Sequence, residues 1–295
     1  MTHNWLHALF SRFRSGIIAY LQRRGLAKYG IMKGKVSRLT SGLVLKDGNP
    51  DDMTAEVEAL AFVAAHTSIP VPRVQYHWQE LDRPEPRGLI IMNLMPGEML
   101  ARVWSKISPA QRQHVMRTLA GFVSQLRLLS QPPPPCLSRL PREGWIGSTL
   151  GHSFVDCSVT SQIPSFGPFA TESDFHDYRL SRYNTIAWSA PTAAKFTDVR
   201  RRMRDDHPIV FTHGDFNRRN VLVRVHGPEA EDIEVTALLD WEQAGWRPIY
   251  WEPWKWIFET PHVPEWVDVA ENGMGYKEDV LLARELQGIM GTLPP

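Results

Sequence analysis

Residues 209–246 read IVFTHGDFNRRNVLVRVHGPEAEDIEVTALLDWEQAGW, and they carry the most informative polar pattern in the chain. An apolar run leads into His-Gly-Asp at 213–215, and Asn220 follows five residues after the aspartate. Runs of apolar and β-branched residues at 221–225 and 235–239 flank a polar turn. Two such runs around a turn predict an antiparallel hairpin.

The predicted hairpin brings three oxygen-bearing side chains to one end. Folded symmetrically about residue 230, it sets Asn220 opposite Asp240, with the Asp215 carboxylate in the loop that precedes it. A small hard cation such as Mg²⁺ binds one or two protein oxygens together with the phosphates of a substrate. Turn capping is the alternative role for Asp215 and Asn220, but three hard ligands at an ordered spacing are more than a turn requires.

This pattern resembles a known family. Asp215 followed by Asn220 resembles the catalytic loop of the protein-kinase-like fold, and Asp240 resembles the magnesium-binding aspartate of that fold. With Asp-Trp-Glu at 240–242, the chain is similar to the aminoglycoside phosphotransferase/choline kinase family, and in particular to the fungal proteins that carry this phosphotransferase domain. The resemblance covers nearly the whole chain from residue 31 onward and is strongest in the quoted stretch.

The resemblance implies a fold and a division of the chain. We expect an α+β, bilobal protein-kinase-like fold, with a small antiparallel-sheet N-lobe over residues 31–95. A larger, mainly helical C-lobe with the catalytic loop and the acceptor pocket is expected over 96–295. Residues 1–30 are expected to form an N-terminal amphipathic helical extension, because apolar residues recur on one face.

The first 46 residues have an unusual charge. They hold nine Lys and Arg and no Asp or Glu, whereas the remainder holds 24 Lys and Arg against 32 Asp and Glu, a net charge of −8. The acidic remainder excludes nucleic acid as a partner of the whole protein. We expect this basic, acid-free helix to pack on the kinase body, and the fungal proteins that the chain resembles often begin with such a helix. It also fits a mitochondrial targeting peptide or a helix on a membrane surface.

Lys46 closes the strand-like run 41–46, where the resemblance implies the lysine that grips the α- and β-phosphates of ATP. The helical run at 55–66 carries two glutamates, and the kinase fold needs one of them to hold the lysine. Glu58 is the better match by its spacing to the following Pro-Val-Pro, and Glu56 remains the alternative. No glycine-rich phosphate loop precedes Lys46, and the small-molecule branch of the fold commonly lacks one.

The apolar run from residue 88 ends in Pro-Gly and corresponds to the last N-lobe strand and the hinge. The resemblance implies that Met92 lies behind the adenine of ATP. The backbone from Asn93 to Met95 would then hydrogen-bond the edge of the base.

The implied activity is an ATP- and Mg²⁺-dependent phosphotransferase, a small-molecule kinase that moves the γ-phosphoryl group of ATP to a hydroxyl group. Asp215 would orient the acceptor hydroxyl and take its proton, while Asn220 and Asp240 would hold Mg²⁺. The acceptor partner would be an amino alcohol, an aminosugar or a related metabolite. A catalytically inactive nucleotide-binding scaffold is the alternative, favoured by the missing glycine loop.

Other residues of the quoted stretch have predicted roles. His213 is expected to be buried and to shape the loop by hydrogen bonds. Glu242 could support the metal or line the rim of the site, and either Arg218 or Arg219 could touch the γ-phosphate or the substrate.

The rest of the C-lobe gives coarser expectations. A helix is predicted from Ser108 to about residue 129, with Ser108 as N-cap, and 136–172 is expected to be irregular. Asp174 and Asp177 either begin a helix or face a cationic substrate. The C-terminal tryptophans either pack in the core or form an aromatic box for a quaternary ammonium group; they are Trp241, Trp246, Trp251, Trp254, Trp256 and Trp266.

Length and composition are those of a globular chain. The 295 residues are 43% hydrophobic, and no apolar run is long enough to span a bilayer. Cys136 and Cys157 stand in no metal-ligand or disulfide pattern, which indicates a reducing compartment, and we expect a cytoplasmic protein.

Overall fold

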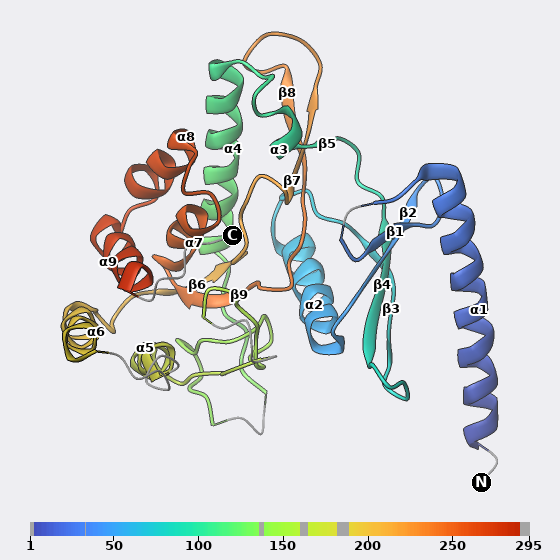
Figure 1. The fold of residues 1–295 in the computed structure, drawn as a ribbon, viewed down its shortest axis with the longest axis horizontal. Coiled ribbons are helices and arrows are strands. Elements are labelled where there is room, and N and C mark those ends of the chain that lie inside the picture. Colours follow the sequence, from blue (N-terminus) through green and yellow to red (C-terminus); the bar gives the residue numbers. More distant parts are fainter. Residues whose placement is uncertain (1–2, 33, 136–138, 160–164, 182–188, 290–295) are drawn as a thin grey trace. The chain divides into compact units, whose positions relative to one another are not determined.

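The computed structural model describes residues 3–32, 34–135, 139–159, 165–181 and 189–289. Antiparallel strands dominate its N-terminal region and helices its C-terminal region (Figure 1), which confirms the predicted α+β class. The chain divides into two compact units. The first unit comprises Met1–Thr54 and Pro72–Met95, and the second comprises Ala55–Val71 and Pro96–Pro295.

The first unit is a four-stranded antiparallel sheet with one long helix against it. The strand order is β1-β2-β4-β3, and Lys46 of β2 pairs with Val36 of β1 and Ile90 of β4. The elements are α1 (His3–Tyr29), β1 (Val36–Arg38), β2 (Leu43–Gly48), β3 (Val74–Glu80) and β4 (Arg87–Asn93).

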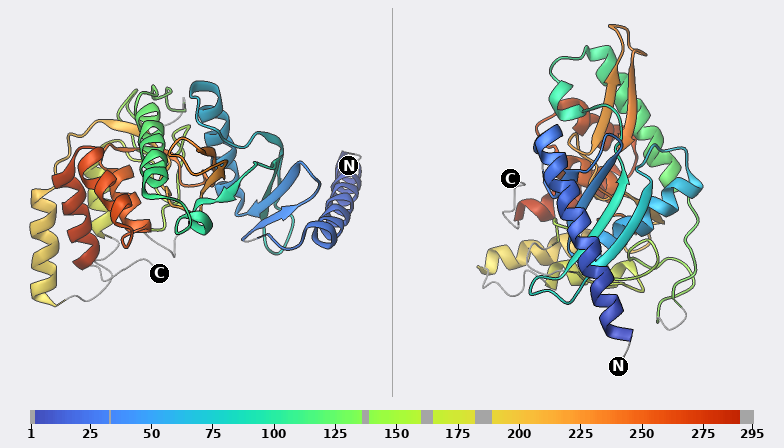
Figure 2. Two further views of the ribbon diagram at one scale, coloured as in Figure 1. Left: turned by 90° about the horizontal axis from the view of Figure 1, so that it is seen from above. Right: turned by 90° about the vertical axis from the view of Figure 1, so that its right-hand side faces the viewer.

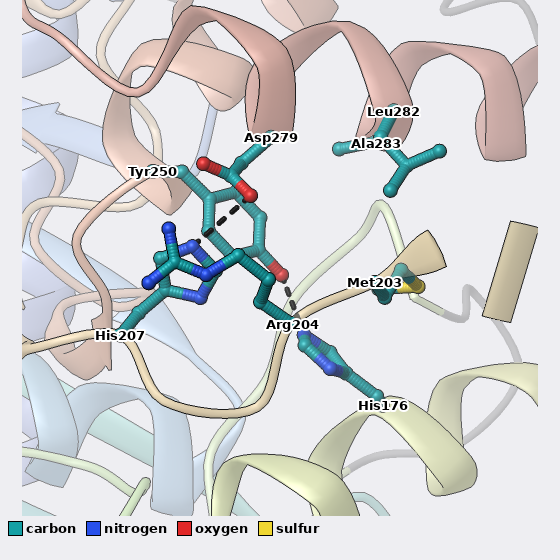
Figure 3. A pocket seen from close by; sticks show the side chains of 8 residues that line it. All are labelled: His176, Met203, Arg204, His207, Tyr250, Asp279, Leu282 and Ala283. Carbon is teal, nitrogen blue, oxygen red and sulfur yellow. Dashed lines mark hydrogen bonds and ion pairs between the residues drawn. The ribbon is translucent and has the colours of Figure 1, made fainter. Parts of the chain in front are cut away.

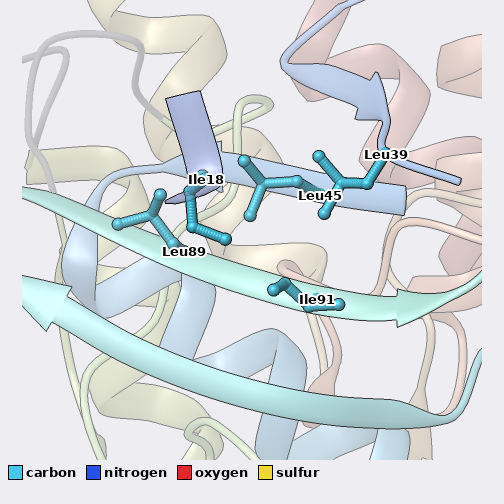
Figure 4. Packing of buried hydrophobic residues seen from close by; sticks show 5 residues of the cluster. All are labelled: Ile18, Leu39, Leu45, Leu89 and Ile91. Carbon is cyan, nitrogen blue, oxygen red and sulfur yellow. The ribbon is translucent and has the colours of Figure 1, made fainter. Parts of the chain in front are cut away.

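Helix α1 packs on this sheet through one of its faces. Figure 4 shows Ile18 pointing toward the strands, where it packs with four buried residues, Leu39, Leu45, Leu89 and Ile91. Gly25 lies so close to the backbone of Arg38 that a Cβ atom there would be 1.7 Å from the Arg38 carbonyl oxygen. The helix is therefore built into the fold of the first unit, as expected for a helix that packs on the kinase body.

Helix α2 (Pro50–His66) begins five residues before the predicted helical run. The Oδ1 atom of Asn49 accepts a hydrogen bond from the Asp51 N–H (2.9 Å), and Pro50 occupies the first helical position. Asparagine before proline is a common helix start, because the proline has no N–H group to leave unpaired. The part of α2 from residue 55 onward belongs to the second unit.

The second unit contains a three-stranded sheet, β5-β7-β8, and a separate pair, β6-β9. The strands are β5 (Glu98–Met99), β6 (Ile209–Thr212), β7 (Val221–Val225), β8 (Ile233–Leu238) and β9 (Gly245–Pro248). The described helices of this unit after α2 are α3 (Leu100–Val103), α4 (Pro109–Arg127), α5 (Glu172–Ser181), α6 (Ala190–Arg202), α7 (Trp251–Glu259), α8 (Pro264–Asp268), η1 (Val269–Gly273) and α9 (Lys277–Ile289).

Two sequence predictions hold in this unit. Ser108 caps α4, and it forms a reciprocal capping box with Gln111. Within 139–159 and 165–171 the chain is irregular and is joined to its surroundings by isolated β-bridges, such as Gly147 with Trp246.

The tryptophans of the C-terminal part form the core of the second unit. All six that the sequence singled out are at most 1% exposed. The ring centroids of Trp256 and Trp266 lie 4.9 Å apart, and those of Trp251 and Trp254 lie 4.6 Å apart. A ligand has no access to rings buried to this degree, so the packing role is correct and the aromatic-box alternative is wrong.

Among the described residues, we find no helix whose length and apolar character would let it cross a membrane.

Candidate functional site

The predicted catalytic loop joins β6 to β7 in the second unit. Its glycine is required by the backbone: Gly214 has a φ of 76°, and a Cβ atom there would lie 2.7 Å from the carbonyl oxygen of Gln243. Glycine adopts this conformation without strain. The loop can therefore turn tightly against the segment that follows β8.

His213 shapes the loop, as the sequence predicted. Its side chain is fully buried. Its Nδ1 accepts a hydrogen bond from the Asp215 N–H (3.1 Å), and its Nε2 lies 2.9 Å from the carbonyl oxygen of Leu239. One neutral tautomer satisfies both bonds, with the proton on Nε2. His213 thus links the start of the loop to the end of β8.

Glu252 of α7 is a loop-supporting residue that the sequence did not reveal. Its carboxylate accepts hydrogen bonds from the backbone N–H groups of His213 and Gly214. Complete burial raises the pKa of Glu252 to about 7, against the opposing effect of these two bonds. Its only signal was a charged residue among the tryptophans of α7, and nothing in the sequence pointed from it to His213, 39 positions away.

Asp215 and Asn220 are in direct contact. The Nδ2 group of Asn220 donates to Asp215 Oδ2 (2.7 Å) and to the Asp215 carbonyl oxygen (3.0 Å). Asn217 donates to the other carboxylate oxygen, Oδ1, at 3.0 Å. Because the amide nitrogen of Asn220 is used in this way, its Oδ1 is the atom that would meet a cation.

The Asp215 carboxylate lies in an acidic environment. Its pKa is raised to about 8, first by burial and then by the negative charge of Glu259, with a smaller effect of Asp240. Lys255 acts in the opposite direction. A divalent cation beside the loop would also favour the ionised form, because an opposite charge stabilises a carboxylate.

The hairpin exists, but its register differs by one residue from the prediction. The Leu239 N–H donates to the Asn220 carbonyl oxygen (2.8 Å), so Asn220 lies opposite Leu239 and not Asp240. A register shift between Leu222 and Val223 breaks the assumed symmetry. Asp240 follows directly with a φ of 68°, a left-handed conformation that is uncommon outside glycine and is often found at functional sites.

Three carboxylates form a cluster at the end of β8. Oxygen atoms of Glu56, Asp240 and Glu242 all lie within 4.8 Å of one another. Carboxylate oxygens are the ligands that Mg²⁺ prefers, so the donor set fits this cation. The cluster contains the predicted ligand Asp240, and Glu242 lies next to it.

Glu56 and Glu58 occupy different surroundings. Residues two apart on a helix point roughly 200° apart, so they cannot share a face. Glu56 is 2% exposed and lies in the carboxylate cluster. Glu58 is partly exposed, and burial raises its pKa against the opposing charge of His152. The sequence favoured Glu58 and kept Glu56 as the alternative, and Glu56 is the one that lies beside Asp240. The predicted pairing of Glu58 with Lys46 stays a prediction.

The remaining predicted site residues belong to the first unit. Lys46 is 8% exposed in β2, and Met92 is 6% exposed in β4. The N–H group of Asn93 donates to Arg73, and that of Leu94 donates to Gly42.

Within the predicted hinge, the N–H group of Met95 makes no described backbone hydrogen bond. It is therefore the hinge donor that could meet the edge of a base. The side chain of Asn93 donates to Met95 Sδ (3.1 Å), which connects the two residues.

A buried ion pair lies next to the catalytic loop. Lys255 Nζ is 3.0 Å from Asp156 Oδ1, and neither side chain has any exposed surface. The same ammonium group is 3.3 Å from Gln243 Oε1 and 3.9 Å from Glu259 Oε1. This cluster joins the irregular segment before residue 160 to α7, and no pattern in the sequence predicts it.

Both arginines of the loop contact other side chains of the protein. Arg219 forms an ion pair with Glu259 (3.3 Å), and the guanidinium of Arg218 lies 5.7 Å from the ring centroid of Trp104. The structure thus gives both arginines protein partners, and a contact with the γ-phosphate stays a prediction.

The acidic start of α5 serves the helix itself. Thr171 accepts a hydrogen bond from the Asp174 N–H (3.1 Å) and donates to the Asp174 carboxylate (2.7 Å). Asp177 forms an ion pair with Arg200 (2.6 Å). These contacts agree with the helix-start interpretation of Asp174 and with a structural role for Asp177.

A small pocket lies between α5, α9 and the segment before β6 (Figure 3). It is lined by His176, Met203, Arg204, His207, Tyr250, Asp279, Leu282 and Ala283. Neither Asp215 nor Asn220 lines it, so it is separate from the predicted chemistry. In Figure 3 His207 faces Asp279, and His176 faces the hydroxyl group of Tyr250 at 2.7 Å.

His207, in the segment before β6, links that segment to α5 and α9 at this pocket. Its Nδ1 is 2.8 Å from Glu172 of α5, and its Nε2 is 3.1 Å from Asp279 of α9. Burial alone would lower the pKa of His207, but the hydrogen bond and charge of Glu172 and the charge of Asp279 raise it above its usual value. The rings of Tyr250 and Tyr276 complete its surroundings.

We expect His207→Gln to destabilise the protein by about 1–3 kcal/mol at acidic pH, because it removes bonds between a cation and two carboxylates. A raised folded-state pKa gives stability that is fully present below the unfolded value, near 6.5, and is lost as the pH rises through the folded-state pKa. Thermal unfolding from pH 5 to 9 measures this. The difference between wild type and variant should shrink toward high pH, and a constant difference would contradict the ion-pair role.

The chain is similar to known proteins in sequence pattern and in fold. The profile of the Phosphotransferase enzyme family matches residues 35–281. The structure of a thermostable mutant of aminoglycoside phosphotransferase APH(4)-Ia in a ternary complex with ADP and hygromycin B is similar, with a TM-score of 0.58 and 14% identity over 91% of this chain and 88% of that chain. No curated protein sequence matches the chain.

Two further solved structures are similar. The GDP complex of aminoglycoside 2'-phosphotransferase-IIIa has a TM-score of 0.55 and 11% identity over 88% of this chain and 79% of that chain. An aminoglycoside-3'-phosphotransferase of type VIII has a TM-score of 0.50 and 17% identity over 91% of this chain and 99% of that chain. At these identities the likeness concerns the fold.

Proposed function

Because the chain belongs to the Phosphotransferase enzyme family, we propose that it transfers the γ-phosphoryl group of ATP to a hydroxyl group of a small molecule. The proposed acceptor is an amino alcohol, an aminosugar or a related metabolite. The observation that carries the proposal is the pairing of Asp215 with Asn220 at 2.7 Å in a loop held by Glu252.

In this proposal Asp215 receives the proton of the acceptor hydroxyl. Phosphoryl transfer needs alignment and charge neutralisation more than covalent help from the protein. Asn217 and Asn220 hold the two carboxylate oxygens of Asp215 in place. The bond from Asn220 Nδ2 to the Asp215 backbone keeps this geometry independent of the substrate.

Mg²⁺ is the proposed cation, held by Asn220 Oδ1 and the Asp240 carboxylate, with Glu242 beside them. Such an ion would neutralise charge on the transferring phosphates. The support is the donor set: hard oxygen atoms of Glu56, Asp240 and Glu242 lie within 4.8 Å of one another. We propose that Glu56, and not Glu58, supports this group.

The nucleotide-binding residues of the first unit remain as predicted from the sequence. Lys46 is proposed to bind the α- and β-phosphates. Met92 is proposed to line the base, and the backbone N–H of Met95 to hydrogen-bond its edge. Similar structures contain ADP in one case and GDP in another, so ATP stays the donor predicted from the sequence and the binding experiment below compares it with GTP.

Two observations support a cationic acceptor. Similar structures were solved with hygromycin B and with kanamycin. In this chain, Glu259 is the charge with the largest effect on Asp215, and its side chain keeps 9% of its surface exposed. An ammonium group of the acceptor would be attracted by this negative charge, which Glu259 shares with Arg219 and Lys255.

A cytoplasmic location stays a prediction from the cysteine content.

Comparing Glu56→Gln with Glu58→Gln tests which glutamate supports the metal site. We expect Glu56→Gln to weaken Mg²⁺-dependent ATP binding by about 10- to 100-fold, as outer-shell changes commonly do. Glu58→Gln is the matched control on the opposite face of α2 and should bind like wild type. Titration calorimetry with ATP, with and without Mg²⁺, gives the affinities. A larger loss for Glu58→Gln would reverse the assignment.

The function itself is tested in two steps. Calorimetry first shows whether the wild type binds ATP or GTP in the presence of Mg²⁺. A screen of hydroxylated amines and sugars for ADP release then identifies an acceptor. Nucleotide binding without ADP release for any acceptor would contradict the transferase and support the scaffold alternative.

One observation favours the scaffold. The turn between β1 and β2 is where a phosphate loop would lie in a protein kinase. Its N–H groups at Gly42 and Leu43 donate to Thr40 Oγ1 at 3.2 and 3.1 Å. These donors are used within the turn and are not presented to a phosphate. The ADP-release screen separates the two functions.

A further inference from the structure

Helix α1 leaves apolar and basic side chains in solvent on the side that faces away from its sheet. Ile17 is 45% exposed and Tyr20 is 56% exposed. Arg23, Arg24 and Lys28 are exposed on the following turns. We refer to these five residues as the outer face of α1. In Figure 2 the helix runs along one face of the sheet of the first unit.

The inner face of α1 is already occupied, so the helix cannot rotate to bury the outer one. Ile18 is 7% exposed and packs on the sheet. Ser15 donates to Glu80 (3.1 Å), and Gln22 donates to Ser37 (3.3 Å). Neighbouring helical residues point about 100° apart, so Ile17 and Ile18 cannot both meet the same sheet.

The apolar and basic residues of the outer face share one side of the helix. Ile17 and Tyr20 are three residues apart, and Arg24 follows Tyr20 by four residues, the spacing that keeps positions on one side of a helix. These side chains therefore form one exposed stripe.

The charge pattern identifies the kind of partner. Residues 1–46 hold nine Lys and Arg and no acidic residue. Arg23 and Arg24 border the apolar stripe on α1. An apolar stripe bordered by basic residues lets a helix lie in the plane of a membrane, with apolar side chains among the lipids and cations near lipid phosphates.

We propose that the outer face of α1 binds an anionic lipid surface. Ile17 and Tyr20 enter the headgroup region, and the arginines pair with phosphate groups. A targeting peptide that is cleaved off would not need Gly25 at a close contact with Arg38, so the integration of α1 into the first unit favours a permanent docking element.

Co-sedimentation of the full chain with lipid vesicles tests the proposal. Phosphatidylcholine vesicles are compared with vesicles that also contain phosphatidylserine. Ile17→Glu and Tyr20→Glu should each lower partition onto the anionic vesicles by about tenfold or more. Leu281→Glu on α9 is the matched control, because Leu281 is 41% exposed and lies in the second unit. This control should bind like wild type.

A double variant, Arg23→Gln with Arg24→Gln, should weaken binding mainly at low salt, because screening reduces the attraction at high salt. Equal binding to both vesicle types, or equal loss for Leu281→Glu, would overturn the proposal. A wild type that does not sediment with vesicles would also overturn it. If Ile17→Glu instead dissolves a dimer seen by analytical ultracentrifugation, the outer face binds a second copy and not lipid.

Discussion

Replacing Asp215 by alanine is expected to lower turnover by about 10³-fold, since a positioned general base contributes roughly 10²- to 10⁴-fold. ATP binding should stay close to wild type. Asn220 Nδ2 also bonds the backbone carbonyl of residue 215 (3.0 Å), and this bond survives the substitution. Turnover is measured as ADP release with an acceptor found by screening, and ATP affinity is measured by calorimetry.

The fold should not suffer from this substitution. The pKa of Asp215 is raised to about 8, first by burial, so its ionised form is unfavourable in the folded protein. Removing it should leave the melting temperature unchanged or higher. Asp206→Ala, at an exposed carboxylate, is the control for charge removal alone. A turnover near wild type in Asp215→Ala would remove Asp215 as the base.

The features that were predicted correctly depend on local sequence. The β7-β8 hairpin follows from two apolar runs around a turn, and the start of α4 follows from Ser108 and Gln111 three residues apart. The glycine at position 214 also has a local cause, because the tight turn there needs a positive φ. The lobe boundaries stay predictions, and Cys136 lies outside the described residues.

The features that could not be predicted depend on contacts between residues that lie far apart in the sequence. Glu252 supports the loop from 39 residues away, and Lys255 meets Asp156 across 99 residues. The choice between Glu56 and Glu58 depends on which face of α2 meets Asp240, which no spacing along the helix reveals. The one-residue register error has the same origin, because a bulge is a property of the paired strands.

The second large effect is expected at Asp240, where asparagine is the substitution of choice. Residue 240 has a φ of 68°, which asparagine tolerates and alanine does not tolerate as well. Asp240→Asn therefore removes the charge and keeps the backbone. Mg²⁺-dependent ATP binding should weaken by about 100-fold or more, because a metal ligand is affected at least as strongly as its outer-shell partners.

The two aspartates are distinguished by what each variant loses. Asp215→Ala should bind Mg·ATP and fail to transfer, whereas Asp240→Asn should fail at binding, and its turnover should fall by about 10³-fold. Raising the Mg²⁺ concentration should restore part of the binding in Asp240→Asn, since Asn220 and the neighbouring carboxylates remain. Glu242→Gln is expected to show a smaller loss. If Asp240→Asn binds Mg·ATP like wild type, the cation is held elsewhere, and the cluster of Glu56, Asp240 and Glu242 is structural.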